Sequence, residues 1–168
     1  MEIVKELTIS REFDAPRERV YKAWSDTNLL GQWWGPDGVT NPTVEWDFRP
    51  GGKIYHVMLA GPEMGEMAGQ EWPMRGEFNE VVEPEKLVFT SSPLADGKPL
   101  LDTVTTVTFD EKDGKTLMTV HIAVGNVTPE GEFAVAGMEA GWNQQAEREC
   151  VQHAPDEDRY AEHEHLLD

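Results

Sequence analysis

The stretch from Glu12 to Pro36, EFDAPRERVYKAWSDTNLLGQWWGP, decides the fold. Apolar side chains recur in it at helical spacing in two short runs, one through Val20 and Trp24 and one that ends on Trp33-Trp34. Proline is favourable in a first helical turn, where its missing N–H has no partner to lose, and Gly35-Pro36 ends the second run. We therefore predict two short helices, each with one buried face, directly after an extended segment.

After these helices the apolar residues alternate with polar ones, which is the period of a β-strand. The expected strands begin with residues 3–13 and continue as three hairpins: 44–48 with 54–59, 76–82 with 87–90, and 103–109 with 116–124. Helical periodicity returns only from about residue 131, through Val135, Met138 and Trp142. This order indicates an α+β fold, in which about six or seven strands form a mostly antiparallel sheet with the helices on one side.

Composition limits the location and the partners of the protein. The 168 residues are enough for one domain, and 14 basic against 32 acidic residues give a net charge of −18. Nucleic acids and anionic membranes need clustered Lys or Arg, so we expect neither as a partner. Cys150 has no second cysteine with which to form a disulfide, and the sequence shows no leader and no apolar run of membrane-spanning length. We therefore expect a cytoplasmic protein without membrane insertion.

Several short motifs occur in an order that resembles one known family. They are Phe13-Asp14-Ala15-Pro16, Val20, Trp24, Trp33-Trp34-Gly35-Pro36, Arg49-Pro50-Gly51-Gly52, Gly76-Glu77-Phe78, Glu83-Pro84-Glu85-Lys86-Leu87 and Gly137-Met138-Glu139-Ala140-Gly141-Trp142. Over roughly residues 5 to 150 the chain is similar to the activators of heat-shock-protein ATPase homologues, which belong to the START-like (SRPBCC) superfamily. The resemblance implies a helix-grip fold, in which a curved antiparallel sheet wraps around the long C-terminal helix.

The resemblance also implies a cavity between sheet and helix, where members of the superfamily hold a hydrophobic or amphipathic small molecule. Alternation along the strands and the helix suggests these ligand-binding residues: Trp46, Phe48, His56, Met58, Phe78, Phe89, Val107, Met138 and Trp142, with Arg75 at the mouth. Alternative roles stay open, with Trp142 as a core anchor, His56 as a core histidine and Arg75 in an exposed salt bridge. We interpret Trp33 and Trp34 as structural.

The segment at residues 60–73, AGPEMGEMAGQEWP, is the least regular part of the domain. Its glycines disfavour a stable helix, whereas Met64, Met67 and Trp72 supply apolar side chains that should not stay in water. One hypothesis is a lid over a variable ligand, and the alternative is an ordinary long hairpin loop.

The C-terminal part departs from the family pattern. At residues 143–150 polar side chains replace the leucines that relatives carry on the inner face of the helix, so we expect the second half of this helix to be poorly anchored. Pro155 and the acidic residues after it indicate a flexible tail. We therefore divide the chain into a START-like ligand-binding domain at residues 1–152 and an acidic tail at 153–168. His163 and His165, two residues apart, do not share a helical face, and we expect no metal site there.

Recognisable catalytic signatures are missing from the sequence, and Cys150 stands in no known nucleophile motif. We expect no catalytic residue, no cofactor and no metal, and predict a protein that binds a small hydrophobic or aromatic molecule as carrier, sensor or buffer. One alternative is an enzyme of the polyketide cyclase or dehydrase type that uses His56, Arg75 or a buried carboxylate in the same cavity. Another is a stress-related regulator of a chaperone ATPase, although we do not expect a chaperone interaction. A homodimer stays open.

Overall fold

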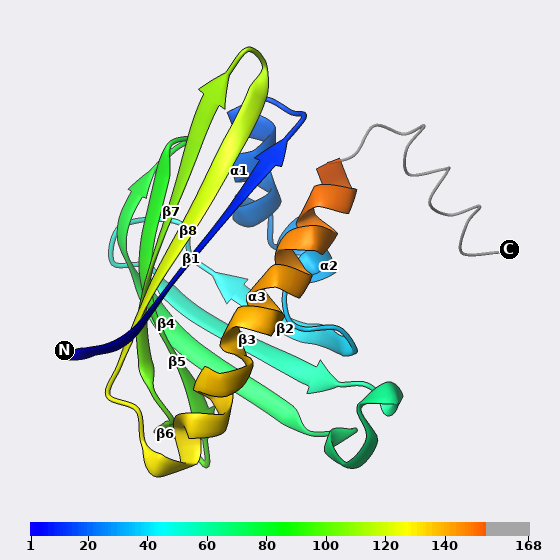
Figure 1. Cartoon of the computed structure of the whole chain (residues 1–168), viewed down its shortest axis with the longest axis vertical. Helices are drawn as coiled ribbons and strands as arrows, with labels where there is room; N and C mark the ends of the chain where they lie inside the picture. The colour runs from blue at the N-terminus through cyan, green and yellow to red at the C-terminus, as the bar shows by residue number, and fades with distance from the viewer. Residues whose placement is uncertain (154–168) are drawn as a thin grey trace, which may run out of the picture.

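A curved antiparallel sheet wraps around a long C-terminal helix in the computed structural model, which describes residues 1–153 (Figure 1). The strands are β1 (Ile3–Phe13), β2 (Val39–Trp46), β3 (Lys53–Ala60), β4 (Glu71–Val82), β5 (Lys86–Ala95), β6 (Lys98–Pro99), β7 (Asp102–Lys112) and β8 (Lys115–Gly125). The α-helices are α1 (Arg17–Ser25), α2 (Thr27–Trp33) and α3 (Glu132–His153), and the short 3₁₀ helices are η1 (Pro62–Met67) and η2 (Pro129–Gly131). Apart from its first residue, the acidic tail expected at 153–168, which includes His163 and His165, lies outside the described residues.

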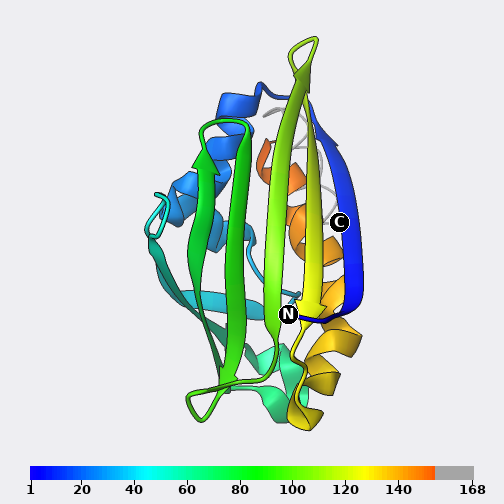
Figure 2. The same ribbon diagram turned by 90° about the vertical axis from the view of Figure 1, so that its left-hand side faces the viewer.

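The sheet runs in the order β1-β8-β7-β5-β4-β3-β2, all neighbours are antiparallel, and β6 adds a short pairing to β5. Figure 2 shows its outer face, with the three α-helices on the opposite, concave side. The predicted α+β class, the three hairpins, the two short helices after the first strand and the helix-grip arrangement are confirmed. Among residues 1–153, no helix is both long and apolar enough to cross a membrane.

The irregular segment at 60–73 is more ordered than its glycines indicated. It contains the 3₁₀ helix η1, interrupted at Gly65, whose φ of 62° is open to glycine because it has no Cβ. Strand β4 then begins at Glu71, five positions before the predicted start at Gly76. Trp72 therefore lies on a strand and not in a loop.

The two short helices form because their ends are satisfied locally and their inner faces are aromatic. Pro16 precedes α1, and the Asp26 side chain accepts a hydrogen bond from Asn28 N at 3.0 Å at the start of α2. Trp24 and Trp33 are almost fully buried and meet edge to face, with ring centroids 4.9 Å apart. Together with α1 packing against β7 and β8, these rings fill one end of the concave face.

The first end of α3 is fixed by backbone contacts to the segment before β7. Thr128 donates from both its N–H and its hydroxyl to the Leu100 carbonyl oxygen, at 2.9 Å each. Gly131 packs directly on the same carbonyl, where an added Cβ would come within 2.2 Å of the oxygen. Only glycine fits at this position, so the start of α3 is held close to the sheet.

The second half of α3 is well anchored, and the expectation of poor anchoring was wrong. Polar side chains replace the missing leucines by bonding the loop between α2 and β2. Gln145 Oε1 accepts from Gly35 N and Gln144 Oε1 accepts from Asp37 N, both at 2.8 Å, and Arg148 pairs with the Asp37 carboxylate. We call Gln144, Gln145 and Arg148 the α3 clamp. The bonds of the two glutamines to backbone N–H groups give direction as well as attachment.

Glu149, one turn beyond Gln145, is an unpaired carboxyl in the core. It is fully buried, and neither of its oxygens reaches hydrogen-bond geometry with another group. Burial raises the pKa of Glu149 well above its ordinary value of 4.5, and the nearby indole N–H of Trp24 offsets this only in part. The protonated, neutral form is therefore the one that suits the folded state.

Because of Glu149, the free energy of unfolding should fall as the pH rises. Above pH 4.5 the unfolded chain loses this proton while the folded chain keeps it, so stability falls by up to about 1.4 kcal/mol per pH unit until the folded pKa is passed. Urea unfolding at several pH values should show Glu149→Gln gaining on the wild type over this range. Glu139→Gln, on the exposed face of α3, is the control and should keep a constant difference; a constant difference for Glu149→Gln would contradict the prediction.

Candidate functional site

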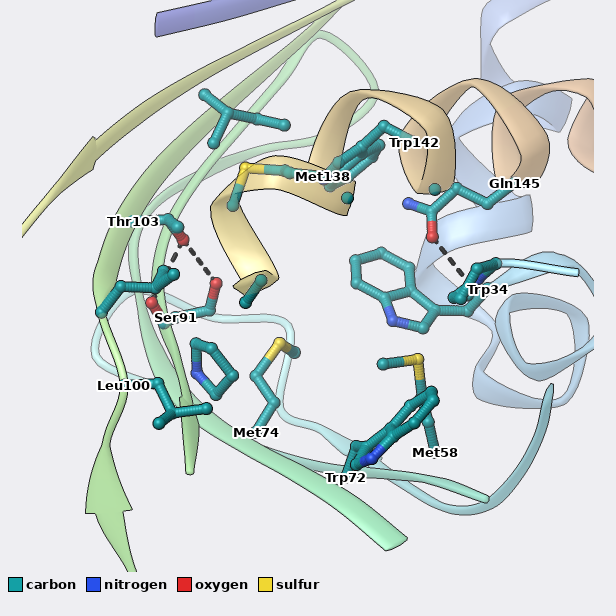
Figure 3. A pocket seen from close by; sticks show the side chains of 18 of the residues that line it. Trp34, Met58, Trp72, Met74, Ser91, Leu100, Thr103, Met138, Trp142 and Gln145 are labelled. Atoms are coloured by element: carbon teal, nitrogen blue, oxygen red, sulfur yellow. Dashed lines mark hydrogen bonds between the residues drawn. The ribbon is translucent and has the colours of Figure 1, made fainter. Parts of the chain in front are cut away.

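A cavity of about 350 Å³ lies between the sheet and α3 (Figure 3). The helix contributes residues three or four apart, which share one face of a helix: Ala134, Gly137, Met138, Gly141, Trp142 and Gln145. The two glycines leave room on this face, since a Cβ at Gly137 would meet nothing within 4 Å and one at Gly141 only Pro36 Cβ at 3.8 Å. The helix can thus pass over the sheet without filling the space beneath it.

The opposite wall is formed by residues of five strands. They are Met58 of β3, Trp72, Pro73 and Met74 of β4, Phe89, Ser91, Pro93 and Leu94 of β5, Thr103 and Thr105 of β7, and Ile122 of β8. Leu100, Leu101 and Trp34 also line the cavity, together with Gly35, Pro36, Met67 and Phe133. Apolar and aromatic groups therefore make up most of the surface that a ligand would touch.

The cavity opens to solvent between the first turn of α3 and η1. Two of its lining side chains are exposed, Phe133 by 70% and Met67 by 44%. In both views η1, the turn between β3 and β4, and the first turn of α3 lie toward the same end of the molecule (Figures 1 and 2). A small molecule could enter by this mouth without displacing a strand.

Four polar side chains with hydroxyl or amide groups interrupt the apolar lining. Gln145 is buried at the end of α3 that the clamp holds, and Ser91, Thr103 and Thr105 are buried on the sheet wall. The Ser91 and Thr103 hydroxyl oxygens are 2.6 Å apart, and Thr103 also donates to the Ser91 carbonyl oxygen at 3.1 Å. Among the described residues that line the cavity, none carries an ionisable acid or base.

Comparison with known proteins fits this architecture. The family model described as Activator of Hsp90 ATPase homolog 1-like protein matches residues 14–149. The chain belongs to this family. The match covers both short helices, the whole curved sheet after β1 and most of α3, so the cavity lies within the part of the chain that the family shares.

Solved structures of similar fold come from several bacteria. A protein from Arthrobacter aurescens shares 29% identity with a TM-score of 0.71, covering 90% of this chain and 90% of its own. A protein from Chromobacterium violaceum shares 24% identity with a TM-score of 0.72, covering 90% and 99%. The AHSA1 protein from Silicibacter pomeroyi shares 24% identity with a TM-score of 0.68, covering 88% and 96%. None of the curated proteins compared with the chain matches it.

The structure brings about half of the suggested residues together at the cavity. Met58, Phe89, Met138 and Trp142 line it, as do Met67 and Trp72 of the segment proposed as a lid. Met64 is half-buried and is not among the lining residues. The lining thus includes side chains from both elements that the hypothesis required, the sheet and α3.

The other suggested residues lie elsewhere. Trp46, His56, Phe78 and Val107 are buried on the concave face, but in the part that α1, α2 and the aromatic cluster fill. Phe48 stacks on Trp46 at 5.9 Å, and Arg75 is exposed on the outer face opposite Tyr55. For the four buried residues, alternation along the strands identified the inner face of the sheet correctly. The cavity occupies only part of that face, so these residues do not line it.

Sequence reasoning missed several lining residues. Trp34 was interpreted as structural, yet its ring forms part of the wall and also packs against Trp142 at 5.3 Å. Gln145 had a usable signal, since a polar residue three positions after Trp142 falls on the inner face of the helix. Ser91 and Thr103 could have been suspected as small polar residues on the inward side of apolar strands.

His56 serves the core and has no free nitrogen. Its Nδ1 accepts from the Trp46 indole N–H at 3.0 Å, so the proton sits on Nε2, which faces Asn41 Oδ1 at 2.7 Å. Burial lowers the pKa of His56 from 6.5 to about 4, which keeps the ring neutral at physiological pH. His56 is not among the cavity-lining residues, and these contacts assign it to holding β2 against β3.

Replacing His56 with alanine should destabilise the protein by about 3 kcal/mol, because the change leaves a cavity and two buried groups without partners. Urea unfolding at pH 7 measures this loss. Met74→Ala, on the cavity wall, provides the comparison and should cost less stability, because its side chain borders an existing cavity and makes no hydrogen bond. A His56→Ala protein of wild-type stability would show that the two hydrogen bonds do not hold the strands.

Proposed function

We propose that the protein binds a small hydrophobic or aromatic molecule in the cavity under α3, as a carrier, sensor or buffer. The observation that carries the proposal is a cavity of about 350 Å³ with a mostly apolar lining and an exposed mouth. Ligand pockets range from about 300 to 1,000 Å³ and combine apolar walls with a few polar groups. We place this binding activity in the domain at residues 1–152.

Binding is better supported than catalysis. General acid–base chemistry needs a titratable side chain within hydrogen-bond reach of the substrate. The described lining residues include no Asp, Glu, His, Cys, Lys or Arg. The two residues that an enzyme hypothesis would use first, His56 and Arg75, lie in the core and on the outer face. No observation on the described residues favours regulation of a chaperone over ligand binding.

A variant that fills the cavity should abolish binding. Met138→Trp adds a large side chain on the cavity face of α3, whereas Glu139→Trp adds the same group on the exposed face and is the control. Native mass spectrometry of each protein from its own host should show a bound apolar compound in the wild type and in Glu139→Trp, and none in Met138→Trp. Titration with fatty acids, flavonoids and polyketide-like aromatics should quench the tryptophan fluorescence of the same two proteins. A bound compound that survives in Met138→Trp would place it outside the cavity.

The role of the η1 segment can be tested with a pair of methionines. Met67 lines the mouth and is exposed, so Met67→Ser should weaken binding of an apolar probe about threefold to tenfold while the melting temperature changes little. Met64→Ser removes the same group from the same 3₁₀ helix but outside the lining, and should leave affinity unchanged. Fluorescence titration and thermal unfolding measure both effects. Equal losses of affinity in the two variants would argue against a specific contact by Met67.

A further inference from the structure

Gln145 presents to the cavity a hydrogen-bond donor that has no partner. Its side chain is 4% exposed, its Oε1 accepts from Gly35 N, and its Nε2 makes no hydrogen bond. A backbone N–H can only be met by an acceptor, so the contact with Gly35 fixes which way the amide faces. Figure 3 shows the amide nitrogen directed toward the rings of Trp34 and Trp142 on the cavity wall. An unpaired buried donor is costly, and an acceptor on a ligand would remove that cost.

Ser91 and Thr103 present hydrogen-bond acceptors to the cavity. We assign the one hydroxyl proton of Thr103 to the Ser91 carbonyl oxygen, which can only accept, and the 2.6 Å contact between the two hydroxyls is then donated by Ser91. Both protons are then consumed, and only lone pairs remain for a guest. In this assignment the Ser91–Thr103 pair accepts a hydrogen bond from a guest and does not donate one, whereas the neighbouring Thr105 hydroxyl on the same wall can do either.

The lining offers nothing to balance a full charge. Its described members are apolar, aromatic or neutral polar side chains and glycines. A carboxylate or ammonium group on a ligand would lose its hydration without gaining a counter-charge, which is strongly unfavourable. The ligand that suits this cavity is therefore uncharged.

We propose that the cavity selects an uncharged, apolar molecule that carries a carbonyl-type acceptor for Gln145 Nε2 and a hydroxyl-type donor for the Ser91–Thr103 pair. The inference rests on the proposed binding function and adds the chemical class of the ligand. Gln145 belongs to α3, while Ser91 and Thr103 belong to β5 and β7. A molecule that meets both sites would join the helix to the sheet.

Four probes on one two-ring skeleton separate these contributions. Diphenylmethane carries neither group, benzophenone only the acceptor, 4-benzylphenol only the donor, and 4-hydroxybenzophenone carries both. Calorimetric titration of the wild-type protein should give affinities about three- to tenfold tighter for each added group. The anion of 4-benzoylbenzoic acid should bind more weakly than benzophenone. Equal affinities for diphenylmethane and the three polar probes would overturn the proposal.

Matched variants assign each preference to its residue. Gln145→Met should remove the advantage of benzophenone over diphenylmethane, and its control Gln144→Met, which loses a similar backbone contact outside the cavity, should keep it. The double change Ser91→Ala and Thr103→Val should remove the advantage of 4-benzylphenol, while Ser92→Ala should not, because Ser92 bonds Asp102 and does not line the cavity.

The outcomes separate the two proposals. Affinity lost equally for all four probes in Gln145→Met would mean that Gln145 acts only through the fold, which overturns its role in selection. Equal binding of all probes to the wild type, abolished by Met138→Trp, would leave the binding function standing and refute only the polar selection. Binding of no probe, diphenylmethane included, would refute both.

Discussion

The structure depends on how α3 is attached at its two ends, which fix its position over the sheet, while Arg11 of β1 bonds Asn143 and Glu147 along the helix. At the start, Gly131 packs against the Leu100 carbonyl, where no other residue fits, and at the far end the α3 clamp bonds the loop after α2. Between these points Gly137 and Gly141 bring no side chains down onto the sheet. A helix anchored by leucines throughout would be drawn onto the strands by the area it buries. Anchoring by directional hydrogen bonds attaches the helix and leaves the space beneath it open.

The concave face is consequently divided into a filled part and a hollow part. Trp24, Trp33 and Trp46 occupy the filled part, where α1 and α2 lie against the strands. Trp34 belongs to both, since it packs on Trp46 at 5.2 Å and also lines the cavity. The paired tryptophans that end α2 therefore set the boundary between core and cavity. This explains why the same short helices that determine the fold also determine where a ligand could bind.

The architecture was largely predictable from the sequence, because strand alternation, helical spacing and turn residues act locally. The extent of the cavity was not predictable, because it depends on how far α1 and α2 reach across the sheet. Val107 and Phe78 were correctly predicted to face inward, but they lie in the part of the sheet that these helices cover and therefore belong to the core. The polar anchoring of α3 was also missed. Leucines signal burial by composition alone, whereas Gln144 and Gln145 stabilise the helix only through particular backbone partners that no local pattern reveals.

The exposed Phe133 at the mouth has a kinetic consequence. For the proposed ligand, a path past this side chain requires neither helix detachment nor strand opening, so its exit would not be coupled to partial unfolding. The dissociation rate would then be set by the contacts that the ligand makes with the cavity wall, and not by the rate at which the protein opens.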